Sequence, residues 1–198
     1  MNIGIDIDNT ITEVQNELNK VAYDYAIKLG KNIENSDNHL EDIKNNRDTY
    51  KKKFKFSYDE LKYFLKNIQE EITNKAKPRD NAVEVINRLK KEGHKIFIIT
   101  ARDSEFHDNP YLLSKNWLDK HNIAYDKIIV NAREKGIVCK NENIDLFIDD
   151  QLNNCLDVLK EGIKVIRISN EICNNKDIVD LNDWTKIYEY IGELNETK

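Results

Sequence analysis

Five short runs of apolar, largely β-branched residues recur along the chain, and stretches with helical periodicity separate them. Runs of this kind are typical of parallel strands that are buried on both faces of a sheet. Strand and helix patterns that alternate with short loops predict a doubly wound α/β fold with a parallel sheet of about five strands. The expected strands are residues 3–7, 95–100, 127–131, 145–149 and 164–168.

Two amphipathic helical patterns occupy the part of the chain between the first two predicted strands. Residues 14–29 place apolar side chains at helical spacing, and Gly30 ends the pattern. A second apolar stripe covers residues 61–72, and Ser57-x-x-Glu60 before it is a capping box. These patterns predict two helices where the alternation of strand and helix is interrupted.

The interruption defines the expected domain organisation. Between the two helical patterns, residues 31–55 are polar and poorly periodic, which predicts at most one further short helix. We therefore expect a core of residues 1–12 and 78–198 and a small helical cap of residues 13–77, inserted after the first strand. A cap in this position is expected to act as a lid over the end of that strand.

Composition excludes several classes of function. The 198 residues include 31 Lys and Arg against 36 Asp and Glu, a net charge of −5, whereas nucleic-acid binding proteins carry a basic face. No run approaches the roughly 20 apolar residues of a membrane span. Cys139, Cys155 and Cys173 form no Cys-x-x-Cys pair, which predicts reduced thiols in a cytoplasmic protein.

Two carboxylates follow the first predicted strand directly. Asp6 and Asp8 stand two positions apart in the segment Asp-Ile-Asp-Asn-Thr. Two acids this close repel each other unless a cation or a shared proton lies between them. The carboxyl ends of strands are also where open α/β sheets bind their ligands. The pair therefore predicts a functional site.

Further polar residues follow other predicted strands. Thr100 ends the second strand, and Asp149 and Asp150 end the fourth. In a parallel sheet these strand ends share one edge, so the side chains are expected to meet Asp6 and Asp8 there. Carboxylate oxygens in a chain with only four histidines favour Mg²⁺ over zinc. Thr100 and the amides after it are expected to hold an anion at the start of a helix.

A lysine completes the expected phosphate site. Lys135 begins the helical pattern before the strand that carries Asp149, and its ammonium would bind phosphate as a point charge. Arg133 and Lys140 are alternatives, since any of the three is more often a solvated helix charge. The sequence thus predicts a phosphate site beside a magnesium ion.

The same segments resemble a known family in order and in context. DIDNT is similar to motif one (DxDxT) of the haloacid dehalogenase-like superfamily, and IFIIT, which ends at Thr100, is similar to motif two. Lys135 resembles the motif-three lysine, and LFIDD at 146–150 resembles the acidic motif four. The early cap, the TAR segment and the IDD segment most resemble the 5'(3')-deoxyribonucleotidase group and its bacterial nucleotidase relatives.

The resemblance implies a Rossmann-like core and a set of catalytic roles. Asp6 would be the nucleophile that takes up the phosphoryl group as an aspartyl-phosphate. Asp8 would be the general acid and then the base, with a raised pKa, and its backbone carbonyl would bind Mg²⁺. Asp6 and Asp149 would supply the carboxylate ligands of the metal.

The remaining roles concern the phosphate and the surroundings of the metal. Thr100, Ala101, Arg102 and Lys135 would bind the substrate phosphate. Thr10 and Asp150 would support the metal site, with Asp150 as a possible second ligand.

The expected activity is Mg²⁺-dependent hydrolysis of a small phosphomonoester, first of all a (deoxy)nucleoside monophosphate. A sugar phosphate or a nucleic-acid 3'-phosphate end are alternative substrates, and a phosphate-binding module without turnover is an alternative function. A dehalogenase is disfavoured because that chemistry has no use for Asp8. No membrane or stable nucleic-acid partner is expected, and the sequence is silent on oligomeric state.

Overall fold

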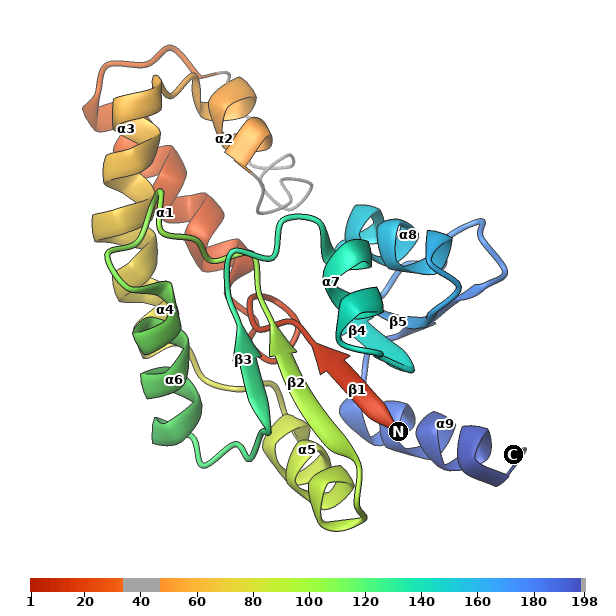
Figure 1. The fold of residues 1–198 in the computed structure, drawn as a ribbon. Helices are drawn as coiled ribbons and strands as arrows, with labels where there is room; N and C mark the ends of the chain where they lie inside the picture. The colour runs from red at the N-terminus through yellow and green to blue at the C-terminus, as the bar shows by residue number, and fades with distance from the viewer. Residues whose placement is uncertain (34–46, 197–198) are drawn as a thin grey trace. The chain divides into compact units, whose positions relative to one another are not determined.

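The computed structural model describes residues 1–33 and 47–196 of the chain. The chain forms two compact units, and most of their elements are labelled in Figure 1. The first unit comprises residues 1–12, 77–103 and 109–198, and the second comprises residues 13–76 and 104–108.

The first unit is built on a six-stranded sheet in the order β3-β2-β1-β4-β5-β6, and every neighbouring pair is parallel. The strands are β1 (Asn2–Ile5), β2 (Lys95–Ile99), β3 (Lys127–Ile129), β4 (Leu146–Asp149), β5 (Lys164–Ile168) and β6 (Ile178–Leu181). The predicted doubly wound parallel sheet is confirmed. The edge strand β6 was not predicted, because three of its four residues are only half-buried and it lacks a continuous apolar run.

Helices cover both faces of this sheet. They are α5 (Ala82–Lys91), α6 (Pro110–Lys120), α7 (Lys135–Asn141), α8 (Leu152–Lys160) and α9 (Trp184–Glu196). Buried residues of α5, α6 and α9 pack with Ile3, Ile5 and Ile98 in one apolar cluster, whereas those of α7 and α8 pack with Phe97 and Phe147 in another. Side chains of successive strand residues point to opposite faces, so strands such as β2 and β4 contribute to both clusters.

The second unit is helical. Its elements are α1 (Gln15–Lys28), α2 (Arg47–Phe54), α3 (Tyr58–Tyr63), the π-helix η2 (Phe64–Gln69) and α4 (Glu70–Lys75). The two predicted helices and the Ser57–Glu60 capping box are confirmed. The short helix expected within residues 31–55 corresponds in part to α2, and residues 34–46 of that stretch lie outside the described residues.

Aromatic side chains form much of the core of the helical unit. Tyr50, Phe54 and Phe64 are almost fully buried, and the ring centroids of Tyr50 and Phe64 are 5.5 Å apart in an edge-on arrangement. Tyr58 and Tyr63 are exposed. The buried rings therefore pack against one another inside this unit.

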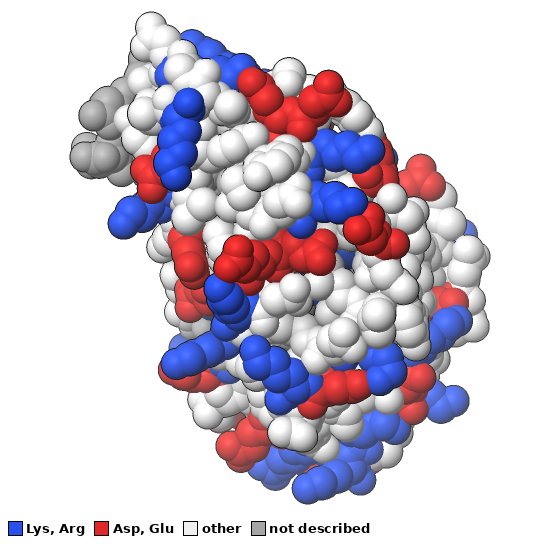
Figure 2. All heavy atoms as spheres, turned by 90° about the vertical axis from the view of Figure 1, so that its left-hand side faces the viewer, with Lys and Arg blue, Asp and Glu red and all other residues white. Residues whose placement is uncertain are grey.

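The surface carries both signs of charge, as expected from the near balance of basic and acidic residues. On the face drawn in Figure 2, Lys and Arg side chains are interspersed with Asp and Glu. Within residues 1–33 and 47–196, no helix is both long enough and apolar enough to cross a membrane.

Gly4 in the central strand β1 gives a test of how tightly the sheet is packed. A Cβ atom at this position would lie 2.9 Å from the Phe147 ring and 3.0 Å from a methyl group of Ile99. We expect Gly4→Ala to lower the free energy of unfolding by about 1–3 kcal/mol, because the buried neighbours have no room to move. Urea unfolding followed by circular dichroism measures this change.

The matched control is Gly192→Ala in α9, where an added Cβ would meet no atom within 4 Å. Alanine is favoured over glycine inside a helix, so this variant should be more stable by about 0.5–1 kcal/mol. Equal effects of the two substitutions would contradict the packing described for β1.

Candidate active site

The strand order reverses at β1, and this reversal creates the candidate site. β1 pairs with β2 on one side and β4 on the other, and Ile5 is in register with both Ile98 and Ile148. The Asp6 N–H continues the pairing by donating to the Ile148 carbonyl at 3.0 Å. The strand ends at such a switch point border the crevice where open α/β sheets bind ligands. Asp6 and Asp149 lie on the two sides of that point.

Lys135 connects three strand ends through its buried ammonium group. Its Nζ donates to Asp6 Oδ1 at 2.5 Å, to Asp149 Oδ2 at 2.9 Å and to the Ile99 carbonyl at 2.9 Å. The Lys135 side chain is 1% exposed, and that of Asp149 is fully buried. The three donors of an ammonium group are therefore all used. Lys135 is the first residue of α7, so the start of this helix determines where the charge lies.

Lys140 does not take part in this network. It pairs with Glu161 at 2.8 Å, and its side chain is 66% exposed. Of the basic residues considered from the sequence, Lys135 is thus the one that reaches Asp6.

The electrostatics of the site leave excess negative charge. Burial, opposed by the Lys135 ammonium, raises the pKa of Asp6 to about 7, and the charges of Asp149 and Asp8 add to the rise. Burial and the charges of Asp149 and Asp6 likewise raise the pKa of Asp150. Although burial alone would lower it, the pKa of Lys135 is raised by Asp149 and Asp6. One lysine does not neutralise the acids around it, so the site favours an additional cation or protons.

Asp149 and Asp150 differ in how their oxygens are used. The Asp149 carboxylate accepts bonds from Lys135, from the Gln151 N–H at 2.8 Å and from Asn154 Nδ2 at 3.0 Å on both oxygens. Asp150 is half-buried, and Thr10 Oγ1 donates to it at 3.4 Å. The Asp150 N–H in turn donates to Thr10 Oγ1 at 3.0 Å. Asp149 is thus held by the protein, whereas Asp150 is linked to the turn after β1.

The turn after β1 is held by Arg79. Its guanidinium donates to the carbonyl of Asn9 from Nε at 3.2 Å and from Nη2 at 3.0 Å, and to the carbonyl of Thr12 at 3.1 Å. Asn9 has a φ of 60°, a left-handed conformation that Asn tolerates better than most residues. The chain therefore turns sharply between Asp8 and Thr10.

The Asp8 carboxylate is held by Arg102. Arg102 Nε donates to Asp8 Oδ2 at 2.9 Å, and Nη2 donates to Asp8 Oδ1 at 2.8 Å. A guanidinium stabilises the charged carboxylate, whereas a general acid must carry a proton. The raised pKa expected for Asp8 therefore stays a prediction.

The expected helix start directly after Thr100 is wrong, because the next helix along the chain, α6, begins at Pro110. The expected contact of Thr100 with an anion stays a prediction. The Arg102 N–H donates to Thr100 Oγ1 at 3.3 Å, and residues 104–108 belong to the helical unit. Thr100 is buried and Ala101 is exposed, so any phosphate contact here depends on individual groups and not on a helix terminus.

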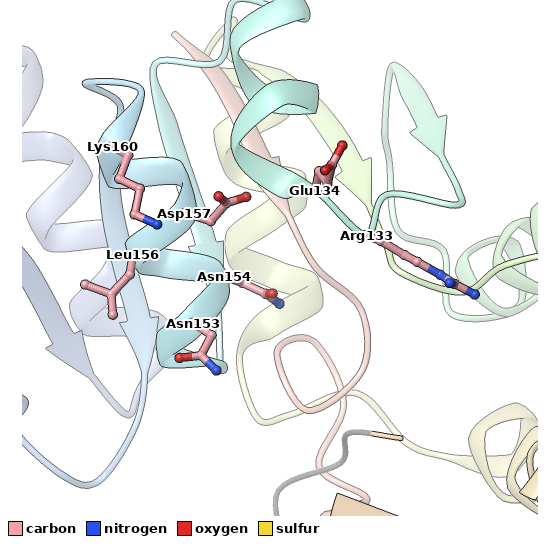
Figure 3. Close-up of a pocket in the computed structure, with 7 residues that line it drawn as sticks. All are labelled: Arg133, Glu134, Asn153, Asn154, Leu156, Asp157 and Lys160. Carbon is pink, nitrogen blue, oxygen red and sulfur yellow. The ribbon is translucent and has the colours of Figure 1, made fainter. Parts of the chain in front are cut away.

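A hollow of about 460 Å³ lies beside the site, between the start of α7 and α8 (Figure 3). Asn154 forms part of its wall and also donates to Asp149, which places the hollow at the border of the site. The lining residues are Arg133, Glu134, Asn153, Asn154, Leu156, Asp157 and Lys160. Arg133 pairs with Asp103 at 2.7 Å.

Sequence reasoning missed Arg79 and Asn154, which support the turn and Asp149. Neither belongs to a motif, and no spacing in the sequence distinguishes them from surface residues. Only the local order of α8 offered a signal, since Asn154 lies in its first turn directly after Asp149 and Asp150.

Within the described residues, no group of three or more His, Cys, Asp or Glu side chains is arranged to hold a metal ion. The predicted Mg²⁺ site needs fewer side chains, because Asp8 was expected to contribute its backbone carbonyl. Mg²⁺ is commonly bound by one or two carboxylates and keeps several waters or substrate oxygens. The metal ligands Asp6, Asp8 and Asp149 stay a prediction.

Comparisons with known proteins identify the family. A family model described as haloacid dehalogenase-like hydrolase matches residues 2–154. The Bacillus subtilis protein named "Putative nucleotidase YqfW" is 28% identical over 197 residues, which are 97% of this chain and 94% of that protein. Nucleotidase CA_C3379 of Clostridium acetobutylicum is 28% identical over 142 residues, 70% of this chain and 71% of that protein.

A solved structure shares the fold. The HAD hydrolase, family IA, variant 3 from Entamoeba histolytica superposes with a TM-score of 0.70 at 14% identity, and 93% of this chain and 94% of that chain are covered. The chain belongs to the haloacid dehalogenase-like hydrolase family, as the four sequence motifs predicted. Within that family it is a phosphomonoester hydrolase.

Removing the Lys135 charge tests whether this contact holds the site together. Lys135→Met leaves the buried carboxylates of Asp6 and Asp149 without their cation, so we expect the free energy of unfolding to fall by about 3–5 kcal/mol. Lys140→Met, the matched control, breaks only an exposed pair and should cost at most about 1 kcal/mol. Chemical unfolding in buffer with chelator measures both, and similar losses would contradict the special position of Lys135.

Proposed function

We propose that this protein hydrolyses nucleoside monophosphates with Mg²⁺, through an aspartyl-phosphate on Asp6. The observation that carries the proposal is the buried lysine that contacts both Asp6 and Asp149 at the switch point of the sheet. In the described residues, the Asp6 carboxylate accepts a hydrogen bond from Lys135 alone, and its side chain keeps 9% exposure. The second carboxylate oxygen is therefore available to attack phosphorus.

The reaction consists of two phosphoryl transfers. An oxygen of Asp6 attacks phosphorus, the bond to the leaving oxygen breaks, and Asp8 gives that oxygen a proton. A water molecule then attacks the phosphorus of the aspartyl-phosphate, Asp8 takes the proton, and Asp6 is released with inorganic phosphate. Lys135 remains charged throughout and stabilises the negative charge that develops on the transferred group. Thr100, Ala101 and Arg102 were predicted to contact the phosphate. Of these, Thr100 directly follows Ile99, whose carbonyl accepts a hydrogen bond from Lys135.

The residues present fit a divalent cation. Burial, to which the charges of neighbouring acids add, raises the pKa of Asp6 and of Asp150, so a divalent cation bound beside them would stabilise their charged forms. Asp6, the Asp8 carbonyl and one carboxylate of the Asp149–Asp150 pair would hold Mg²⁺, which enzymes of this family generally use. When bound, the ion neutralises the phosphoryl oxygens and orients the substrate. Asp150 has more unused bonding capacity than Asp149 for this purpose.

The preference for nucleotides rests on the relatives. Two of them carry nucleotidase in their names, and one matches the chain over 97% of its length, which includes the helical unit. We propose that the helical unit acts as the lid that selects the substrate. A small phosphate ester would be the partner, and a cytoplasmic location agrees with three free cysteines.

Hydrolysis of p-nitrophenyl phosphate by purified protein tests the reaction class. We expect turnover with Mg²⁺, loss of turnover with chelator, and loss of at least about 1,000-fold in kcat for Asp6→Asn because the nucleophile is removed. A panel of nucleoside 5'- and 3'-monophosphates, sugar phosphates and an oligonucleotide with a 3'-phosphate then ranks substrates by kcat/KM.

Two outcomes of these assays would count against the proposal. Equal rates for wild type and Asp6→Asn would exclude Asp6 as the nucleophile. A sugar phosphate with a kcat/KM well above that of every nucleotide would remove the proposed substrate class but leave the reaction intact.

Magnesium binding should depend on pH. A carboxylate must lose its proton to bind the ion, and burial raises the pKa of Asp6 to about 7. Added MgCl₂ should therefore raise the melting temperature more at pH 8 than at pH 6, and Asp6→Asn should lose most of the shift. Matched additions of KCl control for ionic strength. A shift that is the same at both pH values, or that persists in Asp6→Asn, would contradict metal binding at Asp6.

A further inference from the structure

Arg102 is buried, and hydrogen bonds of its own backbone hold it in place. It lies two residues after Thr100 and is 6% exposed. Its N–H donates to Thr100 Oγ1 at 3.3 Å, and its carbonyl accepts from the Asn131 N–H at 2.8 Å. The residue is thus tied to the ends of both β2 and β3, and its side chain starts from a rigid point.

The Arg102 guanidinium binds the Asp8 carboxylate through two parallel hydrogen bonds. Nε and Nη2 reach the two carboxylate oxygens at 2.9 and 2.8 Å, and the side chains of Arg102 and Asp8 are 4% and 18% exposed. The third nitrogen, Nη1, lies 3.5 Å from Ser114 Oγ. Ser114 is fully buried on α6 and donates its own proton to the Pro110 carbonyl at 2.8 Å. A two-pronged contact of this kind determines the orientation of a carboxylate as well as its position.

This orientation matters for a group that transfers protons. Asp8 lies in the sharp turn at Asn9, where a short side chain has several rotamers to choose from. A general acid acts only within hydrogen-bond reach of the leaving oxygen, and an error of about 1 Å costs about 100-fold in rate. The buried Arg102 guanidinium, held at the ends of β2 and β3 and beside α6, restricts the Asp8 side chain to one orientation.

We propose that Arg102 is a positioning residue for Asp8, and not a phosphate ligand. The inference rests on the proposed function, in which Asp8 protonates the leaving oxygen in the first step and takes a proton from water in the second. Arg102 neither gives nor accepts a proton in either step. It acts through Asp8 alone, so its effect must disappear when Asp8 cannot transfer protons.

The test compares Arg102→Gln, Arg102→Lys, Asp8→Asn and the double variant Asp8→Asn/Arg102→Gln by kcat/KM, which reports the first phosphoryl transfer. Substrates are a nucleoside 5'-monophosphate, whose leaving alkoxide needs a proton, and 2,4-dinitrophenyl phosphate, whose leaving phenolate does not. Arg102→Gln should lose about 100-fold on the nucleotide and only a few-fold on the dinitrophenyl ester. In the Asp8→Asn background, the same substitution should change neither rate by more than about twofold.

Further measurements separate positioning from phosphate binding and from misfolding. The inhibition constant for inorganic phosphate should stay within about twofold of wild type in Arg102→Gln, because the phosphate contacts are intact. Arg102→Lys keeps the positive charge but loses the paired hydrogen bonds to Asp8, so its rate on the nucleotide should lie between those of Arg102→Gln and wild type. If Arg102→Gln does not fold, the Lys variant still distinguishes positioning from phosphate binding. Arg88→Gln, on an arginine exposed on α5 and paired with Glu92, is the matched control and should behave as wild type.

Three results would overturn the inference. Equal losses on both esters, or weaker inhibition by phosphate, would make Arg102 a phosphate ligand. Losses that add in the double variant would show that Arg102 does not act through Asp8. If wild type hydrolyses no ester faster than Asp6→Asn, the proposed function itself fails and the inference falls with it; turnover by wild type with uniform losses in Arg102→Gln overturns the inference alone.

Discussion

The site depends on one buried charge, the ammonium of Lys135. A lone ammonium is costly to bury, and here Asp6, Asp149 and the Ile99 carbonyl use all three of its donors. These acceptors come from the ends of β1, β4 and β2, so one contact fixes the relative positions of three strand ends. Lys135 begins α7, so its ammonium reaches Asp6 and Asp149 only when this helix is packed correctly against the sheet.

The acids of the site fall into two groups with different electrostatic surroundings. Asp6 and Asp149 share one ammonium, and burial together with the charges of neighbouring acids raises the pKa of Asp6 and of Asp150. Asp8 has a guanidinium of its own, in Arg102. Asp6 and Asp8 stand two residues apart but are held by different cations, Lys135 and Arg102. In the proposed reaction the nucleophile attacks as the charged carboxylate, whereas the general acid must take up a proton beside a guanidinium that stabilises its charged form.

The sequence was sufficient for features that repeat or that stand in fixed order. Buried β-branched runs predicted five of the six strands, and Lys135 could be preferred over Lys140 because it begins the helix before β4. Contacts made by single side chains across the fold left no pattern: the Arg102–Asp8 fork, Arg79 on the turn and Asn154 on Asp149 depend on tertiary packing. The strand β6 was missed for a related reason, since its half-buried edge needs no continuous apolar run.

The central claim is that Asp6, held by Lys135, takes up the phosphoryl group. The most direct measurement is to quench turnover of a phosphomonoester with acid, reduce the protein with borohydride and locate the modified residue by peptide mass spectrometry. Borohydride reduces an aspartyl-phosphate to homoserine, so we expect homoserine at position 6 in wild type and none in protein incubated without substrate. Homoserine at Asp8 or Asp149, or turnover without any modified aspartate, would contradict it.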